Sequence, residues 1–280
     1  AVLPWGMNQS QHTWTQAGEK MVARLLQGNI PQDEKFIPGQ GIRIALNWYG
    51  EELRNSRETL IVTPETAIPV LPRNLPDTYW QPLKDKYQAQ TAHSQSQQLA
   101  LVGIPMGGAG EGYSNSVLAF GAAPLSYRYD KQHLVPFGEF IPLKSVFGWI
   151  YRDWLNMPLS DLSRGSDEQK PMQMAGQKIA VNICYEDVFG EEIIRQLPQA
   201  TMLVNVSNDA WYGHSIAAYQ HLQFSQMRSL ETGRMMLRAT NTGATAIISH
   251  HGELIATLPH FTTAILNGTV QGYTGTTPYV

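Results

Sequence analysis

The sequence is nearly free of cysteine, and its 280 residues contain a single one, Cys184. A lone thiol forms no internal disulfide and builds no multi-thiolate metal site, so it serves either packing or chemistry. A single buried cysteine is most often an inert small hydrophobe. The apolar stretch 178–183, however, predicts a buried strand that ends at Cys184. Ligand-reactive groups of α/β folds collect where strands end and loops begin, so both interpretations stay open.

Further absences exclude whole classes of function. The formal net charge is −3, with no basic surplus, so we expect no nucleic-acid partner. No run of 18 apolar residues is present, and the chain begins without a recognisable signal peptide, so we expect no membrane-spanning helix here. The sequence contains no C-x-x-C, H-E-x-x-H, Walker or G-x-S-x-G motif. We therefore expect neither a metal nor a cofactor.

Short apolar runs alternate with stretches of helical spacing, which predicts an α/β fold. Several neighbouring strands are joined too tightly for an intervening helix, which favours two mixed sheets packed face to face with helices outside. We expect a lead-in over residues 1–20, one domain over 21–272 and a tail over 273–280. The predicted helices span about 42–53, 77–100 and 216–235, and the predicted strands span 21–26, 60–62, 101–104, 116–120, 125–129, 178–183, 202–206, 237–240, 244–249 and 264–269.

Glu65, Lys131 and Cys184 each lie just past a predicted strand, and together they have a definite chemical meaning. A thiol with a pKa of about 8.5 is mostly protonated at neutral pH and needs a base or a positive field to react. Glu65 could supply the base and Lys131 the field. A lysine ammonium and the backbone N–H after the nucleophile could hold the oxyanion formed on attack. The alternative is that Glu65 is a solvated loop carboxylate and Lys131 a surface lysine.

The contexts of these residues, 63–67, 129–134 and 182–187, resemble the three catalytic blocks of the nitrilase superfamily in the family's order. The resemblance implies a four-layer α-β-β-α sandwich with its catalytic domain over 21–272, which agrees with the predicted strands. It also implies a catalytic triad of Glu65, Lys131 and Cys184.

The segments 134–142, 207–213, 231–234 and 238–243 are similar to those of the bacterial apolipoprotein N-acyltransferases, as are 27–30 and 277–280. That resemblance implies transfer of a fatty acyl chain from a phospholipid, through a Cys184 thioester, to the N-terminal amine of a diacylglyceryl-cysteine lipoprotein. In that family the domain sits at the periplasmic face of the inner membrane between transmembrane helices. We therefore expect an excised domain whose tail leads towards a membrane segment.

Further residues take roles from the same resemblance. Glu139 is similar to the family's second essential glutamate and is expected to orient Lys131, while Tyr185 and Glu186 are expected to shape the cysteine turn. Where the family has Lys-Trp, this sequence has Lys35-Phe36, which keeps an aromatic face but loses the indole N–H, so this sequence departs from the family at that donor. The substrate-binding candidates are Phe36, Asn208, Asp209 and Trp211, although a core position for Trp211 stays open.

The stretch 147–159 is crowded with aromatic and large apolar side chains, although it lies between two of the catalytic blocks. Such residues favour bilayer interfaces, which predicts an arm that faces a membrane surface. The alternative is a satellite core under a loop. The membrane-facing candidates are Trp149, Ile150, Trp154 and Leu155.

Three alternatives to an active acyltransferase domain stay open. A soluble nitrilase-type amidase would hydrolyse small amides with the same triad, although the block 135–142 and the aromatic stretch argue against it. A non-catalytic binding module would be expected to lose a triad member. An excised acyltransferase domain could also fold and yet be inactive without its membrane helices.

Overall fold

The computed structural model describes residues 14–280, apart from 33–34, 36–39, 94–97, 109, 111, 122–126, 141–161 and 175. Within these described residues, twelve strands form two six-stranded mixed sheets. The first sheet has the order β12-β1-β2-β3-β4-β5, and the second has the order β11-β10-β9-β8-β7-β6. In the second sheet β7, β8 and β9 are parallel, so their carboxyl ends lie at one edge.

The strands of the first sheet are β1 (Thr15–Gln27), β2 (Leu60–Val62), β3 (Leu99–Gly108), β4 (Gly112–Phe120), β5 (Arg128–Asp130) and β12 (Ala264–Gly275). Those of the second are β6 (Met172–Met174), β7 (Gln177–Ile183), β8 (Met202–Ser207), β9 (Met236–Thr240), β10 (Ala246–Ile248) and β11 (Leu254–Thr257).

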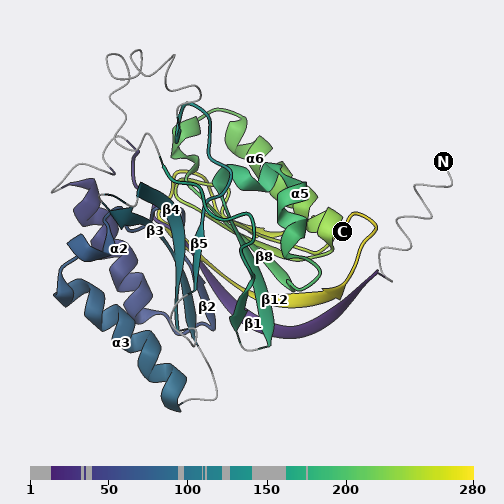
Figure 1. The fold of residues 1–280 in the computed structure, drawn as a ribbon, viewed down its shortest axis with the longest axis horizontal. Helices are drawn as coiled ribbons and strands as arrows, with labels where there is room; N and C mark the ends of the chain where they lie inside the picture. The colour runs from purple at the N-terminus through teal and green to yellow at the C-terminus, as the bar shows by residue number, and fades with distance from the viewer. Residues whose placement is uncertain are drawn as a thin grey trace.

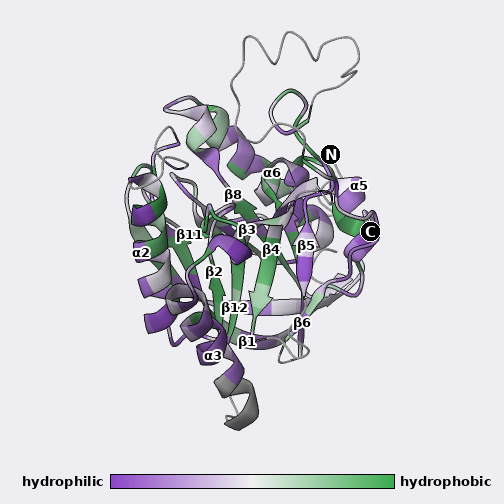
Figure 2. Ribbon diagram, turned by 60° about the vertical axis from the view of Figure 1, so that its left-hand side comes forward, coloured by the Kyte–Doolittle hydropathy of each residue, from purple (hydrophilic) through white to green (hydrophobic). Residues whose placement is uncertain are grey.

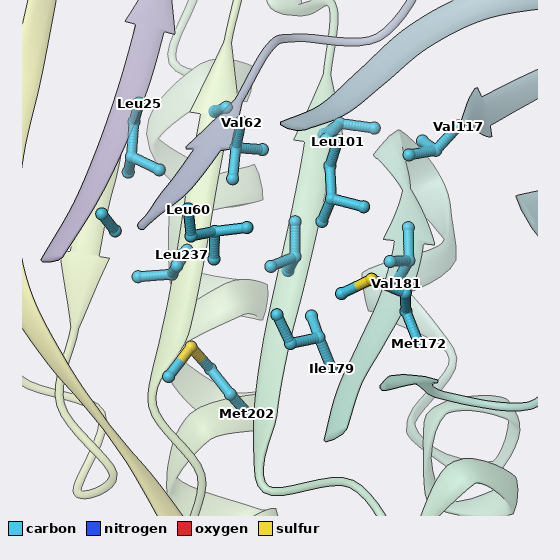
Figure 3. Packing of buried hydrophobic residues seen from close by; sticks show 14 of the residues in the cluster. Leu25, Leu60, Val62, Leu101, Val117, Met172, Ile179, Val181, Met202 and Leu237 are labelled. Carbon is cyan, nitrogen blue, oxygen red and sulfur yellow. The ribbon is translucent and has the colours of Figure 1, made fainter. Parts of the chain in front are cut away.

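Strand side chains alternate between two apolar environments, as the period of two in a β-strand requires. In β2, Leu60 and Val62 point into the core between the sheets, and Ile61 points to the outer face. In β8, Val204 points inward and Leu203 outward. Figure 3 shows the core side chains that come from both sheets. Both faces of these strands are covered, which explains why their sequences are mostly apolar rather than alternating between apolar and polar residues.

Helices cover both outer faces. Helices α2 (Gly41–Asn55) and α3 (Asp77–His93) pack on the first sheet, and α5 (Gly190–Ile193) and α6 (Ala217–Thr232) pack on the second (Figure 1). Helix α2 carries both hydrophobic and hydrophilic colours in Figure 2, as an amphipathic helix on a sheet does. The predicted four-layer α-β-β-α sandwich is therefore confirmed. Within the described residues, no helix combines the length and apolarity that crossing a bilayer demands.

The structure corrects several predicted boundaries. Strand β1 begins at Thr15, inside the predicted lead-in, because residues 15–27 pair antiparallel with β12 along its length to Gly275. Strand β12 likewise extends into the predicted tail. Helix α3 ends at His93 rather than near Ala100, and residue 100 already belongs to β3. The strands β6 and β11 were not predicted.

Candidate active site

The structure brings together the three residues that sequence reasoning singled out. Glu65 follows β2, Lys131 follows β5 and Cys184 follows β7, so two come from the first sheet and one from the second. Lys131 Nζ lies 3.4 Å from Glu65 Oε1, and both groups act electrostatically on the Cys184 thiol. All three side chains are buried. The alternative of a solvated carboxylate and a surface lysine is therefore wrong.

The Glu65 carboxylate is held from several sides. Asn115 Nδ2 donates to Oε1 at 2.6 Å, and the backbone N–H of Asn208 donates to Oε2 at 2.8 Å. Burial alone would raise the pKa of Glu65, but Lys131, Asn115 and the ammonium of Lys35 outweigh it and hold the pKa below its usual value. The group is an anion at neutral pH and can accept a proton.

The backbone of β3 passes close to this carboxylate's loop. A Cβ on Gly103 would lie 2.1 Å from the carbonyl oxygen of Pro64 and 2.7 Å from the amide nitrogen of Thr66. Only glycine allows this approach, which keeps the Glu65 loop against the sheet.

The Lys131 ammonium lies between two carboxylates. Its Nζ is 2.8 Å from Glu139 Oε1, and Asn115 Nδ2 also reaches that oxygen at 3.3 Å. The other Glu139 oxygen accepts the Val135 N–H at 2.9 Å, which folds the 135–139 loop back towards the site. Burial would lower the pKa of Lys131, but the surrounding negative groups raise it well above its usual value. Lys131 is therefore a fixed cation, and Glu139 contacts it as an orienting residue would.

Cys184 occupies a constrained turn. It begins the short 3-10 helix η2 (Cys184–Val188) with φ of +54°, a left-handed conformation that is unusual for a residue with a side chain. Burial, reinforced by the Glu65 charge, raises the pKa of the thiol well above its usual value, and Lys131 opposes the shift. The resting group is a thiol beside an anionic carboxylate, an arrangement suited to deprotonation during attack.

The Glu186 side chain ties the cysteine turn to the loop that carries Lys131. Its Oε2 accepts from the Ile183 N–H at 2.7 Å and from the Tyr129 hydroxyl at 2.9 Å, and its Oε1 accepts from the N–H groups of Gln132 and His133 at 2.6 and 3.1 Å. Burial raises the pKa of Glu186 to about 7 against these donors.

The Tyr185 ring packs edge-on against Phe189, with centroids 5.1 Å apart. Tyr185 and Glu186 both belong to the cysteine turn, and their role in shaping it stays a prediction.

The predicted substrate-binding residues have different surroundings. Asn208 is buried, and its side chain bonds to Gln32 and Asn241. Asp209 is 1% exposed and contacts His221 and Arg238, and its role in substrate binding stays a prediction. Trp211 is 60% exposed, which excludes the core alternative. The candidates Phe36, Trp149, Ile150, Trp154 and Leu155 lie outside the described residues.

Sequence reasoning missed two buried groups at the site. Lys35 Nζ donates to the backbone oxygen of Glu65 at 3.1 Å, and burial lowers its pKa to about 8 despite the nearby Glu65 and Cys184. Its place beside the aromatic position 36 was the only available signal. Asn115, which bridges Glu65 and Glu139, lies in β4 and carries no motif. Among the residues that the structure covers, no group of three His, Cys, Asp or Glu side chains could hold a metal ion.

Comparison with known proteins identifies the family of the chain. The carbon-nitrogen hydrolase family model matches residues 24–279. An apolipoprotein N-acyltransferase of Nitrosomonas europaea is 52% identical over 276 residues, covering 98% of this chain and 54% of the relative. One of Ralstonia nicotianae is 48% identical, covering 100% and 53%. The chain therefore spans about half the length of the curated relatives it matches.

Solved structures agree on the fold. A CN-hydrolase superfamily protein of Xanthomonas campestris aligns with a TM-score of 0.64 at 16% identity, covering 90% of this chain and 91% of that one. Nit3 of Saccharomyces cerevisiae, a nitrilase superfamily member, aligns with a TM-score of 0.63 at 14% identity and covers 91% of each chain. At these identities the similarity concerns the fold alone.

Proposed function

Since the chain belongs to the carbon-nitrogen hydrolase family, we propose that it performs acyl transfer through a thioester on Cys184, as the catalytic domain of an apolipoprotein N-acyltransferase. The observation that carries this proposal is the buried cluster of the Cys184 thiol, the Glu65 carboxylate and the Lys131 ammonium. The names of the matched relatives supply the reaction class. They also disfavour the amidase alternative.

In the first half-reaction Glu65 accepts the thiol proton while Cys184 sulfur attacks the ester carbonyl of a phospholipid. Lys131 and the Tyr185 backbone N–H stabilise the oxyanion. The carbon–oxygen bond then breaks, the departing alkoxide takes the proton from Glu65, and a lysophospholipid leaves. The fatty acyl chain remains on Cys184 as a thioester.

In the second half-reaction the N-terminal amine of a diacylglyceryl-cysteine lipoprotein attacks the thioester carbonyl. Glu65 accepts the amine proton, the carbon–sulfur bond breaks, and the sulfur recovers the proton. Glu139 keeps Lys131 in place through both steps, as its 2.8 Å contact allows. The proposal includes a membrane surface as the place of the reaction, because one substrate is a membrane lipid and the other carries a lipid anchor. It takes the periplasmic face of a bacterial inner membrane from the family resemblance.

The test supplies phospholipid vesicles and a diacylated lipopeptide to the wild-type chain and to Cys184→Ala. Intact-mass spectrometry should show a hydroxylamine-sensitive acyl adduct on the wild-type chain only, followed by acylated lipopeptide. Transfer by Cys184→Ala, or release of free fatty acid without acylated peptide, would contradict the proposal. Hydrolysis of simple amides without any acyl transfer would favour the amidase instead.

A further inference from the structure

A network of buried charges lies directly behind the cysteine turn. Arg238, in β9, donates to Asp187 Oδ2 at 3.1 Å and to Asp209 Oδ2 at 2.9 Å. His221, in α6, contacts the other oxygen of each aspartate, at 3.0 Å for Asp187 and 2.9 Å for Asp209. None of these four side chains is more than 4% exposed. A buried ionic cluster of this kind is sustained only when its charges balance.

The contacts of His221 fix its protonation state. Its Nδ1 faces the Asp209 carboxylate, and its Nε2 faces both Asp187 Oδ1 and the backbone oxygen of Cys184, the latter at 3.1 Å. All of these partners are acceptors, whereas a neutral imidazole carries a single N–H. Both ring nitrogens therefore donate, and the imidazolium balances the network at two positive and two negative charges.

The network reaches the nucleophile through one carbonyl group. The Cys184 oxygen accepts a hydrogen bond from His221 and a second from Asn205 Nδ2, also at 3.1 Å. The peptide bond from Cys184 to Tyr185 is trans, so its C=O and N–H point in opposite directions. Fixing the carbonyl therefore also fixes the direction of the Tyr185 N–H.

The two sides of that peptide belong to different halves of the molecule. Asn205 and His221, which donate to the carbonyl, lie in β8 of the second sheet and in α6, which packs on that sheet. Lys131 and Glu65 come from the first sheet. We infer that the Tyr185 N–H, which points away from the second-sheet network, faces the side of the site that holds Lys131, the other predicted oxyanion donor.

We propose that His221 is a positioning residue: its imidazolium, together with Asn205, locks the Cys184–Tyr185 peptide so that the Tyr185 N–H faces the developing oxyanion. The same two bonds hold Cys184 in its left-handed conformation, which a side-chain-bearing residue keeps only when its surroundings enforce it. This inference rests on acyl transfer as the proposed chemistry, and it assigns no direct contact between His221 and substrate.

The test compares two reactions of the Cys184 sulfur. Acylation by p-nitrophenyl butyrate passes through an oxyanion and releases p-nitrophenolate, whereas alkylation by iodoacetamide displaces iodide and forms no oxyanion. Both require loss of the thiol proton. His221→Gln should slow acylation by about 10- to 100-fold, because losing one oxyanion donor outright costs about 10²–10³. It should change alkylation by less than about 3-fold, and His251→Gln, in the β10–β11 turn, should change neither.

A parallel fall of both rates in His221→Gln would show a merely structural role and overturn the inference, as would no fall in either. If that variant does not fold, Asn205→Ala removes the second donor to the same carbonyl and is measured in the same way. If the wild-type chain is alkylated but never acylated, the proposed function fails separately. In that case a crystal structure of His221→Gln tests the positioning role of His221. A Cys184–Tyr185 peptide in the same orientation as in the wild-type chain would overturn the inference.

The pH dependence of the wild-type chain provides a further test. The groups that face His221 are Asp187, Asp209, Arg238 and the Tyr212 ring, besides the Cys184 carbonyl. Burial and Arg238 lower the pKa of His221, but the two aspartates outweigh them and raise it to about 9. The ratio of acylation to alkylation should therefore fall above about pH 9 and stay flat in His221→Gln. An identical profile in both proteins would contradict the lock.

Discussion

The four hydrogen bonds to Glu186 make its replacement by glutamine a sharp test of how the site is held. One carboxylate oxygen accepts from the Ile183 N–H and the Tyr129 hydroxyl, and the other accepts from the N–H groups of Gln132 and His133. Glu186→Gln keeps the size of the side chain and replaces one acceptor oxygen with an NH₂ donor. Whichever way the amide is turned, that donor faces groups that themselves donate.

The least costly orientation places the amide nitrogen beside Tyr129, whose hydroxyl can turn and accept. Only the Ile183 N–H then loses its partner, and an unsatisfied buried N–H costs about 1–3 kcal/mol. The remaining bonds to the side chain become neutral, and bonds to a charged group are worth about 1 kcal/mol more each. Because burial holds the pKa of Glu186 near 7, part of that charge is already lost at neutral pH. We therefore expect Glu186→Gln to lower the free energy of unfolding by about 2–4 kcal/mol.

Urea unfolding followed by tryptophan fluorescence measures this change, provided that the m-value is the same in both proteins. The matched control is Glu192→Gln, a nearby carboxylate with a partly exposed contact to His133 Nδ1 at 3.0 Å. That substitution should cost about 1 kcal/mol or less. If Glu186→Gln cost no more than Glu192→Gln, the account of Glu186 as the tie between the two loops would be wrong.

Gly103→Ala should destabilise the protein by about 1–3 kcal/mol and slow alkylation of Cys184 by iodoacetamide, because its Cβ would displace the loop at Pro64. Gly138→Ala, whose Cβ would meet nothing closer than 3.5 Å, should leave stability unchanged in the same unfolding assay. Lys35, whose pKa burial lowers to about 8, is deprotonated earlier in the folded than in the unfolded chain. The wild-type free energy of unfolding should therefore rise relative to that of Lys35→Met from about pH 8 to about pH 10, and a constant difference over that range would refute the assignment.

The sequence predicted best the elements that are buried on both faces. The runs 60–62, 178–183 and 202–206 are mostly apolar on both faces because core lies on each side of them, and each proved to be a strand. Residues 15–20 at the start of β1 are mostly polar and exposed, and their partner strand lies about 250 positions along the chain. No local pattern can report such a pairing.

The candidate site divides in the same way. Glu65, Lys131 and Cys184 were found because chemistry-bearing side chains directly follow strand-like runs. His221 was missed because its partners Cys184, Asp187 and Asp209 come from two other segments of the chain, and a lone histidine in a helix carries no motif. A signal was nevertheless present, since His221 and Ser225 are four residues apart and face inward from α6, so the buried side of that helix is partly polar. A polar inward stripe on a helix predicts a buried hydrogen-bond network.

Glu65 and Lys131 follow strands of the first sheet, and Cys184 follows a strand of the second. The hydrophobic core separates the two sheets. The thickness of this core determines the distance between the Cys184 sulfur and the Glu65 carboxylate. A core side chain such as Leu101 or Val181, which does not contact a substrate, therefore helps to set the distance between the nucleophile and its base. Substituting smaller residues in this core should alter the turnover rate as well as the thermal stability, because closely packed interiors transmit small changes in volume.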